Sequence, residues 1–190
     1  NAKILVQIDN IFIDKDSNLT NLVGEISLKK KELISAEISS KINNKNDFSL
    51  SIKTNSRDEK VTNLFIEEPE PFIKNYKFIK GFTEGKLSYG SIEKNNETRA
   101  NLKIFDFKVQ DVPVLAKLLT LASLQGIADL LTGEGIRFNE FEMNYQSKQS
   151  LTNINEMYAI GPAISILMEG YIDRNKAVSY THLRAHETVS

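Results

Sequence analysis

Two histidines that lie four residues apart, His182 and His186, are the first side chains whose spacing suggests chemistry. On a helix, this spacing would place both imidazoles on one face, as in some zinc sites. A zinc ion needs three or four protein ligands, and the pair has neither a carboxylate partner nor a structured context around it. We therefore expect no metal site and no bound cofactor.

The segment that carries both histidines does not continue the pattern that precedes it. Its last thirteen residues read VSYTHLRAHETVS. They resemble translated sequencing-adapter read-through, which recurs at the ends of assembled sequences. We interpret 177–190 as a non-native tail, and we predict fold and function from 1–176. Without the tail, the chain contains no His, Cys or Trp.

Two further places could carry chemistry. Asp106 lies between Phe105 and Phe107, where an acid in apolar surroundings could act as a general base. The sequence Gly133-Glu134-Gly135 could form a phosphate-binding turn, but it follows a predicted helix and precedes a strand, the reverse of the usual order. We expect Asp106 to point outward from a strand and the glycine pair to form a plain turn.

The composition narrows the classes of function. The chain has 190 residues, of which 41% are hydrophobic, enough for a core. The net charge of -1 provides no basic field for nucleic acid, and the absence of Cys excludes disulfides and thiolate metal sites. Catalysis would have to use Asp, Glu, Lys, Tyr or Ser alone. We therefore expect a protein that is not an enzyme.

Residues 1–111 alternate between apolar and polar side chains with a period of two. This period predicts strands with one buried and one wet face. Polar turns such as Asn43-Asn44-Lys45-Asn46 separate strands whose centres lie about a dozen residues apart, which is typical of an antiparallel meander. The alternating apolar sets are Ile4, Val6 and Ile8; Leu22, Gly24, Ile26 and Leu28; Ile34, Ala36, Ile38, Ser40 and Ile42; and Phe48, Leu50 and Ile52.

Three stretches break this regular pattern. Residues 63–80 are irregular and contain a Pro-broken loop. In the strand from Arg99 to Val109, apolar residues change parity after Ile104, which a bulge or a strand apolar on both faces would explain. Residues 112–131 have helical apolar spacing, with Asp111 able to cap and Pro113 suited to the first turn. That helix is too short and too charged to cross a membrane.

Strands resume beyond the helical stretch, at 136–145, around 154–160 and at 163–172. The predicted fold is therefore mainly β: a curved antiparallel meander sheet, shaped like a groove, with one short helical insertion around 112–131.

The block from Phe105 to Tyr145 resembles the C-terminal region of AsmA-like proteins, in particular the large YhdP-type members related to TamB. Its pattern is D-x-P-x-L-A-x-L-L followed by A-S-L-x-G and G-x-G-I-x-F, here at Asp111 to Phe138. A later pair, Ile160-Gly161-Pro162 and Glu169 to Asp173, also looks like the family's strands. The match covers roughly 85–176, whereas the first 80 residues are similar only in style.

This resemblance implies a fragment of a long β groove that is anchored in the bacterial inner membrane and crosses the periplasm. Such a protein conducts phospholipid toward the outer membrane, helping its biogenesis. The membrane would be reached through other parts of the parent, and envelope proteins are possible partners. The residues expected to line the lipid path are Leu102, Ile104, Leu115, Leu118, Leu119, Leu124, Ile127 and Leu131.

Two other interpretations stay open. The strands could form a structural β-sandwich repeat of an envelope protein that binds a protein partner, with a closed, dry core. An enzyme would need a site built from Asp and Glu on loops or completed by other parts of the parent. The helical residues could equally form a core helix under the sheet.

Overall fold

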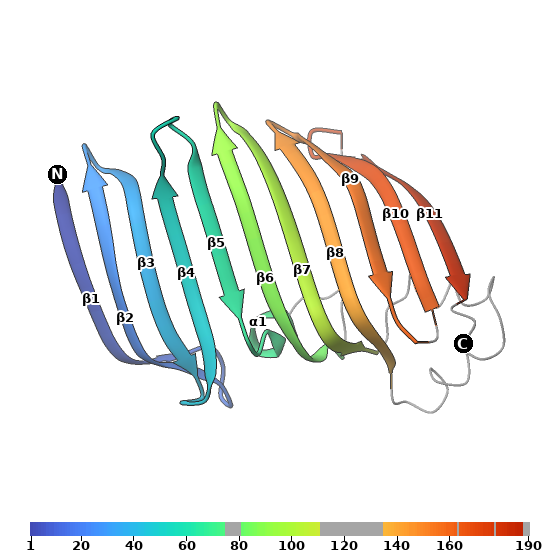
Figure 1. The fold of residues 1–190 in the computed structure, drawn as a ribbon, viewed down its shortest axis with the longest axis horizontal. Helices are drawn as coiled ribbons and strands as arrows, with labels where there is room; N and C mark the ends of the chain where they lie inside the picture. Colours follow the sequence, from blue (N-terminus) through green and yellow to red (C-terminus); the bar gives the residue numbers. More distant parts are fainter. Residues whose placement is uncertain (75–80, 111–134, 163, 177, 188–190) are drawn as a thin grey trace.

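The computed structural model describes residues 1–74, 81–110, 135–162, 164–176 and 178–187. They form one antiparallel sheet of eleven strands, each paired with its neighbour in chain order (Figure 1). The strands are β1 Ala2–Phe12, β2 Asn18–Lys29, β3 Glu32–Ile42, β4 Asn46–Thr54, β5 Lys60–Ile66, β6 Thr83–Lys94, β7 Glu97–Val109, β8 Ile136–Lys148, β9 Leu151–Ile160, β10 Ile164–Asp173 and β11 Val178–Glu187.

Tight turns close several of the hairpins. Asn43 and Asn44 have φ of 51° and 60°, and Asn95 and Asn96 repeat these values at the β6–β7 turn. Two successive residues with positive φ match the twist of the flanking strands, and Asn tolerates this conformation better than most residues do. The β2–β3, β4–β5, β6–β7 and β8–β9 turns lie at the upper end of Figure 1, and α1 (Glu70–Ile73) lies at the lower end.

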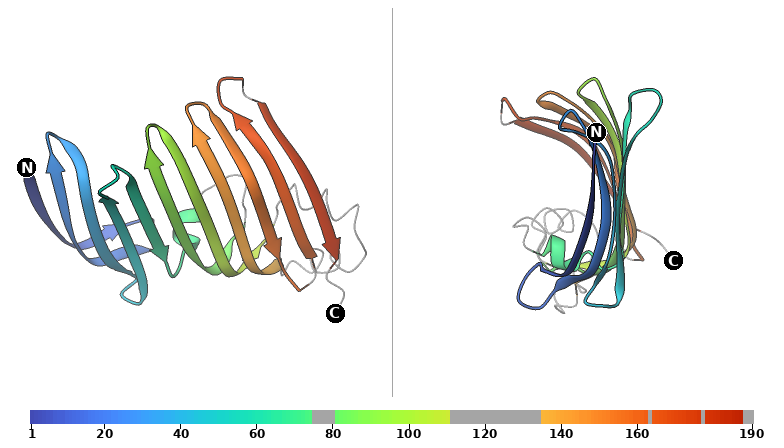
Figure 2. Two further views of the ribbon diagram at one scale, coloured as in Figure 1. Left: turned by 45° about the horizontal axis from the view of Figure 1, so that its top comes forward. Right: turned by 90° about the vertical axis from the view of Figure 1, so that its left-hand side faces the viewer.

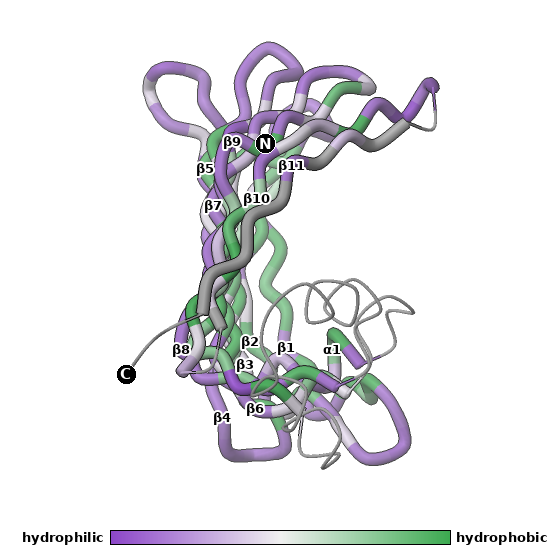
Figure 3. The backbone as a smooth tube through the Cα atoms, turned by 90° about the vertical axis from the view of Figure 1, so that its right-hand side faces the viewer, coloured by the Kyte–Doolittle hydropathy of each residue, from purple (hydrophilic) through white to green (hydrophobic). Residues whose placement is uncertain are grey.

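The period-two pattern gives the sheet one apolar and one polar face. Helix α1 lies on the apolar face, where the ring of Phe72 stacks on Phe48 of β4 with centroids 5.9 Å apart. Among the described residues, no second sheet covers this face, and the strands form a single curved layer (Figure 3).

The lower part of the sheet is bent. Asn21 in β2, Glu84 and Gly85 in β6, and Asp106 in β7 all have positive φ, between 51° and 88°. At Phe105 and Asp106, two exposed residues in succession separate the buried Ile104 from the buried Phe107, so the inward parity changes. The lower ends therefore turn toward the side of the sheet that holds α1, and the upper ends of the last strands lean the same way (Figure 2).

The core lies inside this bend. The rings of Phe82, Phe107 and Phe138 stack in sequence, with centroids 5.5 and 5.4 Å apart. Around them pack Leu19, Leu22, Ile42, Ile66, Leu87, Ile104, Val109, Ile136 and Ile166. Among the described residues, the apolar face is thus closed at its lower end and open at its upper end.

The prediction of a mainly β, curved antiparallel meander is confirmed. The parity change after Ile104 occurs without a register shift, because β6, β7 and β8 keep their pairing on both sides of Asp106. Within 1–176, one strand was missed: β5 lies partly in the stretch expected to be irregular. The predicted helix at 112–131 lies outside the described residues.

Residues of the expected tail form the last strand. β11 pairs along its whole length with β10, from Ile164 opposite Glu187 to Asp173 opposite Val178. An open sheet edge presents unpaired N–H and C=O groups to any extended chain that reaches it. A native segment and a foreign segment would therefore both pair with β10 at this position.

Candidate functional site

The most extensive feature of the apolar face is a stripe of side chains that crosses ten strands. We call it the apolar stripe and define it by two rows that run across the sheet in direct register. The upper row is Val6, Gly24, Ile38, Leu50, Leu64, Tyr89, Leu102, Met143, Met157 and Met168. The lower row is Phe48, Ile66, Leu87, Ile104, Phe141, Ala159 and Ile166.

The two rows differ in how far they are buried. Ile66, Leu87, Ile104 and Ile166 of the lower row belong to the buried core. Every residue of the upper row is only half-buried. Methylene and ring surface along the upper row is therefore accessible to an apolar ligand, and the lower row borders the upper row on the side of the buried core.

A row of polar side chains runs parallel to the stripe nearer the upper ends of the strands, separated from the upper row by one row that includes Tyr145 and Ile154. We call this polar row the polar rim; its members are Thr54, Lys60, Glu93, Thr98, Ser147 and Thr152, again in direct register. A groove of about 800 Å³ lies between the rim and the stripe and is lined by both. Its walls include Met143 and Ile154 on one side and Ser147, Thr152 and Arg174 on the other. The groove is thus amphipathic.

Two tyrosines mark the boundary between apolar and polar rows. The hydroxyls of Tyr89 and Tyr145 lie 3.3 Å apart within the groove. Burial and the hydrogen bond with Tyr89 raise the pKa of Tyr145 to about 12. Tyr145 therefore stays neutral at physiological pH and can donate a hydrogen bond. Tyrosine suits such a boundary because its ring is apolar and its tip is polar.

The opposite face carries a hydrogen-bonded polar network. The Glu142 carboxylate accepts hydrogen bonds from the hydroxyl of Tyr158 and the amide of Asn101, and Lys103 Nζ lies 2.9 Å from it. These partners come from β7 and β9, on either side of β8. The network therefore ties three strands together on the face that the stripe does not use.

Two of the residues predicted to line the lipid path lie at different depths in the apolar face, and the other six lie outside the described residues. Leu102 lies in the upper row and is half-buried, whereas Ile104 lies in the lower row and is buried. Lys103, between them, points to the polar face, where it pairs with Glu142. The expected helix residues Leu115, Leu118, Leu119, Leu124, Ile127 and Leu131 lie outside the described residues.

The candidate sites for chemistry are dispersed. Asp106 is exposed, as the sequence predicted, and His182 is exposed on β11. Gly133 and Glu134 fall outside the described residues. In the part of the chain that the structure describes, no group of three or more His, Cys, Asp or Glu could hold a metal ion. In the same part, no helix is both long and apolar enough to cross a membrane.

Sequence reasoning missed the polar rim and Arg174. The tyrosines had a detectable signal, because Tyr89 continues the parity of Leu87, and Tyr145 that of Met143. Arg174 had none, because it lies in a turn and its position over β8 and β9 follows from the pairing of three strands. Comparison of the chain with family models, curated proteins and solved structures gives no match.

Proposed function

We propose that this chain is a segment of an AsmA-like, inner-membrane-anchored periplasmic protein that conducts phospholipid toward the outer membrane along the apolar stripe. The observation that carries the proposal is the continuity of the stripe. From Val6 to Met168, every strand contributes a residue to the upper row, and none of these residues is charged.

The length of the stripe favours a path over a single pocket. Ten strands separated by about 4.8 Å give a stripe about 43 Å long. One leaflet of a bilayer has a hydrocarbon depth of about 15 Å, which is the length that an acyl chain spans there. The stripe therefore exceeds the length of one lipid, as a conduit requires and a pocket for one ligand does not.

The energetics of such a path need no catalytic residue. An acyl chain on the stripe is removed from water at about 25 cal/mol per Å² of apolar surface. Because the lining is similar from strand to strand, a lipid meets no deep minimum as it moves. Met143, Met157 and Met168 lie at neighbouring positions in the upper row, and flexible thioether side chains adapt to a moving ligand.

The alternative is a structural β-sandwich repeat that binds a protein partner. The half-buried upper row favours it as well, because a second sheet could pack on an uncovered apolar face at a distance of about 10 Å. In that case protein, and not lipid, would contact the stripe.

Photo-crosslinking from neighbouring residues tests the proposal. A photoreactive phenylalanine analogue replaces Leu102, on the stripe, or Lys103, on the opposite face. The chain is expressed in the bacterial periplasm and irradiated, and the adducts are identified by mass spectrometry. A second pair, Met143 and Asn144, repeats the test on β8.

We expect phospholipid adducts at Leu102 and Met143 and none at Lys103 and Asn144. Protein adducts at Leu102 and Met143 would favour the sandwich alternative. Lipid captured equally at all four positions, or at none, would overturn the proposal.

A further inference from the structure

We propose that Arg174, together with Ser147 and Thr152, forms a subsite for the phosphate of a phospholipid headgroup at the polar rim. This inference rests on the proposed function, because it assumes that an acyl chain occupies the stripe. It adds the orientation of the lipid, with the headgroup at the upper rim and the chains below, and the residue that recognises it.

The three side chains form a connected cluster. Arg174 follows β10, and one of its terminal nitrogens, Nη2, lies 3.3 Å from Ser147 Oγ and 3.4 Å from Thr152 Oγ1. The two hydroxyls, from β8 and β9, are 3.1 Å apart. The backbone N–H of Arg174 donates to the carbonyl of Ser150 at 3.0 Å. This bond fixes the base of the side chain, so that the guanidinium extends over the groove.

Arg174 differs from Lys60 and Lys148 in having no carboxylate partner among the described residues. Lys60 pairs with Glu93 at 2.8 Å, and Lys148 lies 3.7 Å from Glu97. Within the described residues, no carboxylate lies within 4 Å of Arg174. Because a guanidinium carries five N–H donors and the two hydroxyls use one nitrogen, most donors are free for an anion. Arg binds phosphate through two parallel hydrogen bonds more readily than Lys does.

The order of residues below Arg174 matches the order of groups in a phospholipid. Ser147 and Thr152 come first, then Tyr145 and Ile154, and then Met143 and Met157 of the upper row. Residues two apart on a strand are about 6.7 Å apart. The three successive pairs can therefore face the phosphate, the glycerol esters and the acyl chains of one lipid in turn. Hydroxyls can donate to the ester carbonyls, and the thioethers contact the acyl chains.

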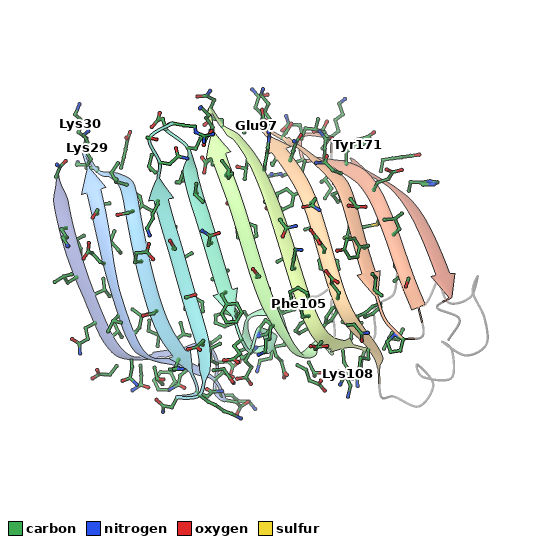
Figure 4. All side chains as sticks on the ribbon, viewed as in Figure 1. Lys29, Lys30, Glu97, Phe105, Lys108 and Tyr171 are labelled. Atoms are coloured by element: carbon green, nitrogen blue, oxygen red, sulfur yellow. The ribbon has the colours of Figure 1, made fainter. Side chains whose placement is uncertain are left out.

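The opposite orientation is excluded by the lower end of the sheet. There the stacked rings of Phe82, Phe107 and Phe138 fill the bend, and a phosphate among them would lose its hydration without compensation. Basic residues lie at both ends of the sheet, Lys29 and Lys30 at the upper end and Lys108 at the lower end (Figure 4), so charge alone does not decide the orientation. The apolar lining of the lower end and the polar lining of the upper end therefore place the headgroup at the upper rim.

Binding of two matched lipids tests the subsite. The 190-residue chain is titrated with acyl-fluorescent phosphatidylglycerol and with the diacylglycerol that carries the same labelled chains. The variants are Arg174→Gln, which removes the charge, and Arg174→Lys, which retains it. Lys45→Gln is the control, because Lys45 is an exposed cation without an ion pair in the described chain, at the other end of the sheet.

We expect the wild-type chain to bind phosphatidylglycerol about tenfold more tightly than diacylglycerol, the range for a charged hydrogen bond at an accessible site. Arg174→Gln should remove most of this preference and leave diacylglycerol affinity within about twofold. Arg174→Lys should keep part of the preference, and Lys45→Gln should keep all of it.

Each other outcome has a definite meaning. If neither lipid binds, the proposed function itself fails. If both lipids bind and Arg174→Gln changes neither affinity, the stripe stands and the subsite is wrong. An equal loss in Lys45→Gln would assign the preference to general surface charge. If glycerol phosphate without acyl chains competes as well as the lipid, the site is a free-phosphate site and the orientation argument is overturned.

Discussion

At the residue scale, Glu142 shows how a polar face on a single-layer sheet is held together. The hydroxyl of Tyr158 donates to its carboxylate, as do Lys103, Asn101 and Asn144, and together they lower the pKa of Glu142 from 4.5 to about 2. The same interaction with Glu142 raises the pKa of Tyr158. Because the Glu142 side chain is only 14% exposed, solvent screens these contacts weakly.

We predict that this network makes folding sensitive to acid. The pKa of Glu142 is lower in the folded chain than in the unfolded chain, so its stabilisation is complete above about pH 4.5 and is lost as pH falls toward 2. Glu142→Gln should lower the free energy of unfolding by about 1–3 kcal/mol at pH 7. The measurement is urea denaturation between pH 7 and pH 2.

The difference between the wild type and Glu142→Gln should shrink across the acid range, because protonation removes the same charge. Glu156→Gln is the control, since the Glu156 side chain is exposed on β9 and makes no hydrogen bond or ion pair within the described chain. A difference that is constant from pH 7 to pH 2 would contradict the role assigned to the charge of Glu142.

At the element scale, the bend in β6 and β7 decides which end of the apolar face is closed. Gly85 has φ of 88°, and a Cβ built on it would lie 2.9 Å from Cβ of Phe107 on the neighbouring strand. Both the backbone conformation and the close approach require glycine here. By contrast, Gly90 in the same strand has an ordinary φ, and the nearest atom to its Cβ would be Asn63 Oδ1 at 3.7 Å.

These two glycines give opposite predictions for the same substitution. Gly85→Ala should destabilise the fold by about 1–3 kcal/mol, because it combines strain with a steric clash. Gly90→Ala should be neutral or stabilising by about 0.5 kcal/mol, because it reduces the entropy of the unfolded chain. Thermal denaturation of both variants measures the difference. Equal effects at both positions would mean that the bend does not depend on Gly85.

The strands were predictable where one parity holds along the whole element. Ile4, Val6 and Ile8 in β1, and Phe48, Leu50 and Ile52 in β4, alternate without interruption, and both strands form as expected. β5 was missed because apolar residues occur at both parities in it, Val61 and Phe65 against Leu64 and Ile66. Such a strand is defined by its neighbours in the sheet more than by its own pattern.

The candidate site was predictable only in part, for a related reason. Parity alone places Leu102 on the apolar face and Lys103 on the polar face. The rim cluster joins a turn after β10 to positions on β8 and β9, and its existence depends on the register of both pairings. A register shift between Met168 and Gly170 intervenes, and no pattern within one strand reveals it.

At the scale of the whole molecule, the chain exposes more surface than a closed fold of its size. Its accessible area is 12367 Å², whereas a compact protein of this mass exposes about 9,200 Å². A single-layer sheet exposes both of its faces where no second layer packs on it, and the described residues form such a single layer. An apolar ligand on the apolar face would therefore add a layer to the structure, and its binding should stabilise the fold.

We predict that phospholipid raises the thermal midpoint of unfolding. A ligand at a hundred times its dissociation constant stabilises the folded state by about 2.7 kcal/mol, which corresponds to a shift of roughly 5–10 °C for a domain of this size.

Leu102→Gln, on the stripe, should reduce the shift because it places a polar group against the acyl chain. Lys103→Gln, one residue along on the opposite face, should leave the shift intact even if it lowers the midpoint itself. The comparison uses the shift within each variant, so it is independent of any loss of stability that the substitution causes. Equal shifts in the two variants would place the lipid elsewhere on the molecule, and the absence of a shift in the wild-type chain would mean that the uncovered face does not take up lipid in solution.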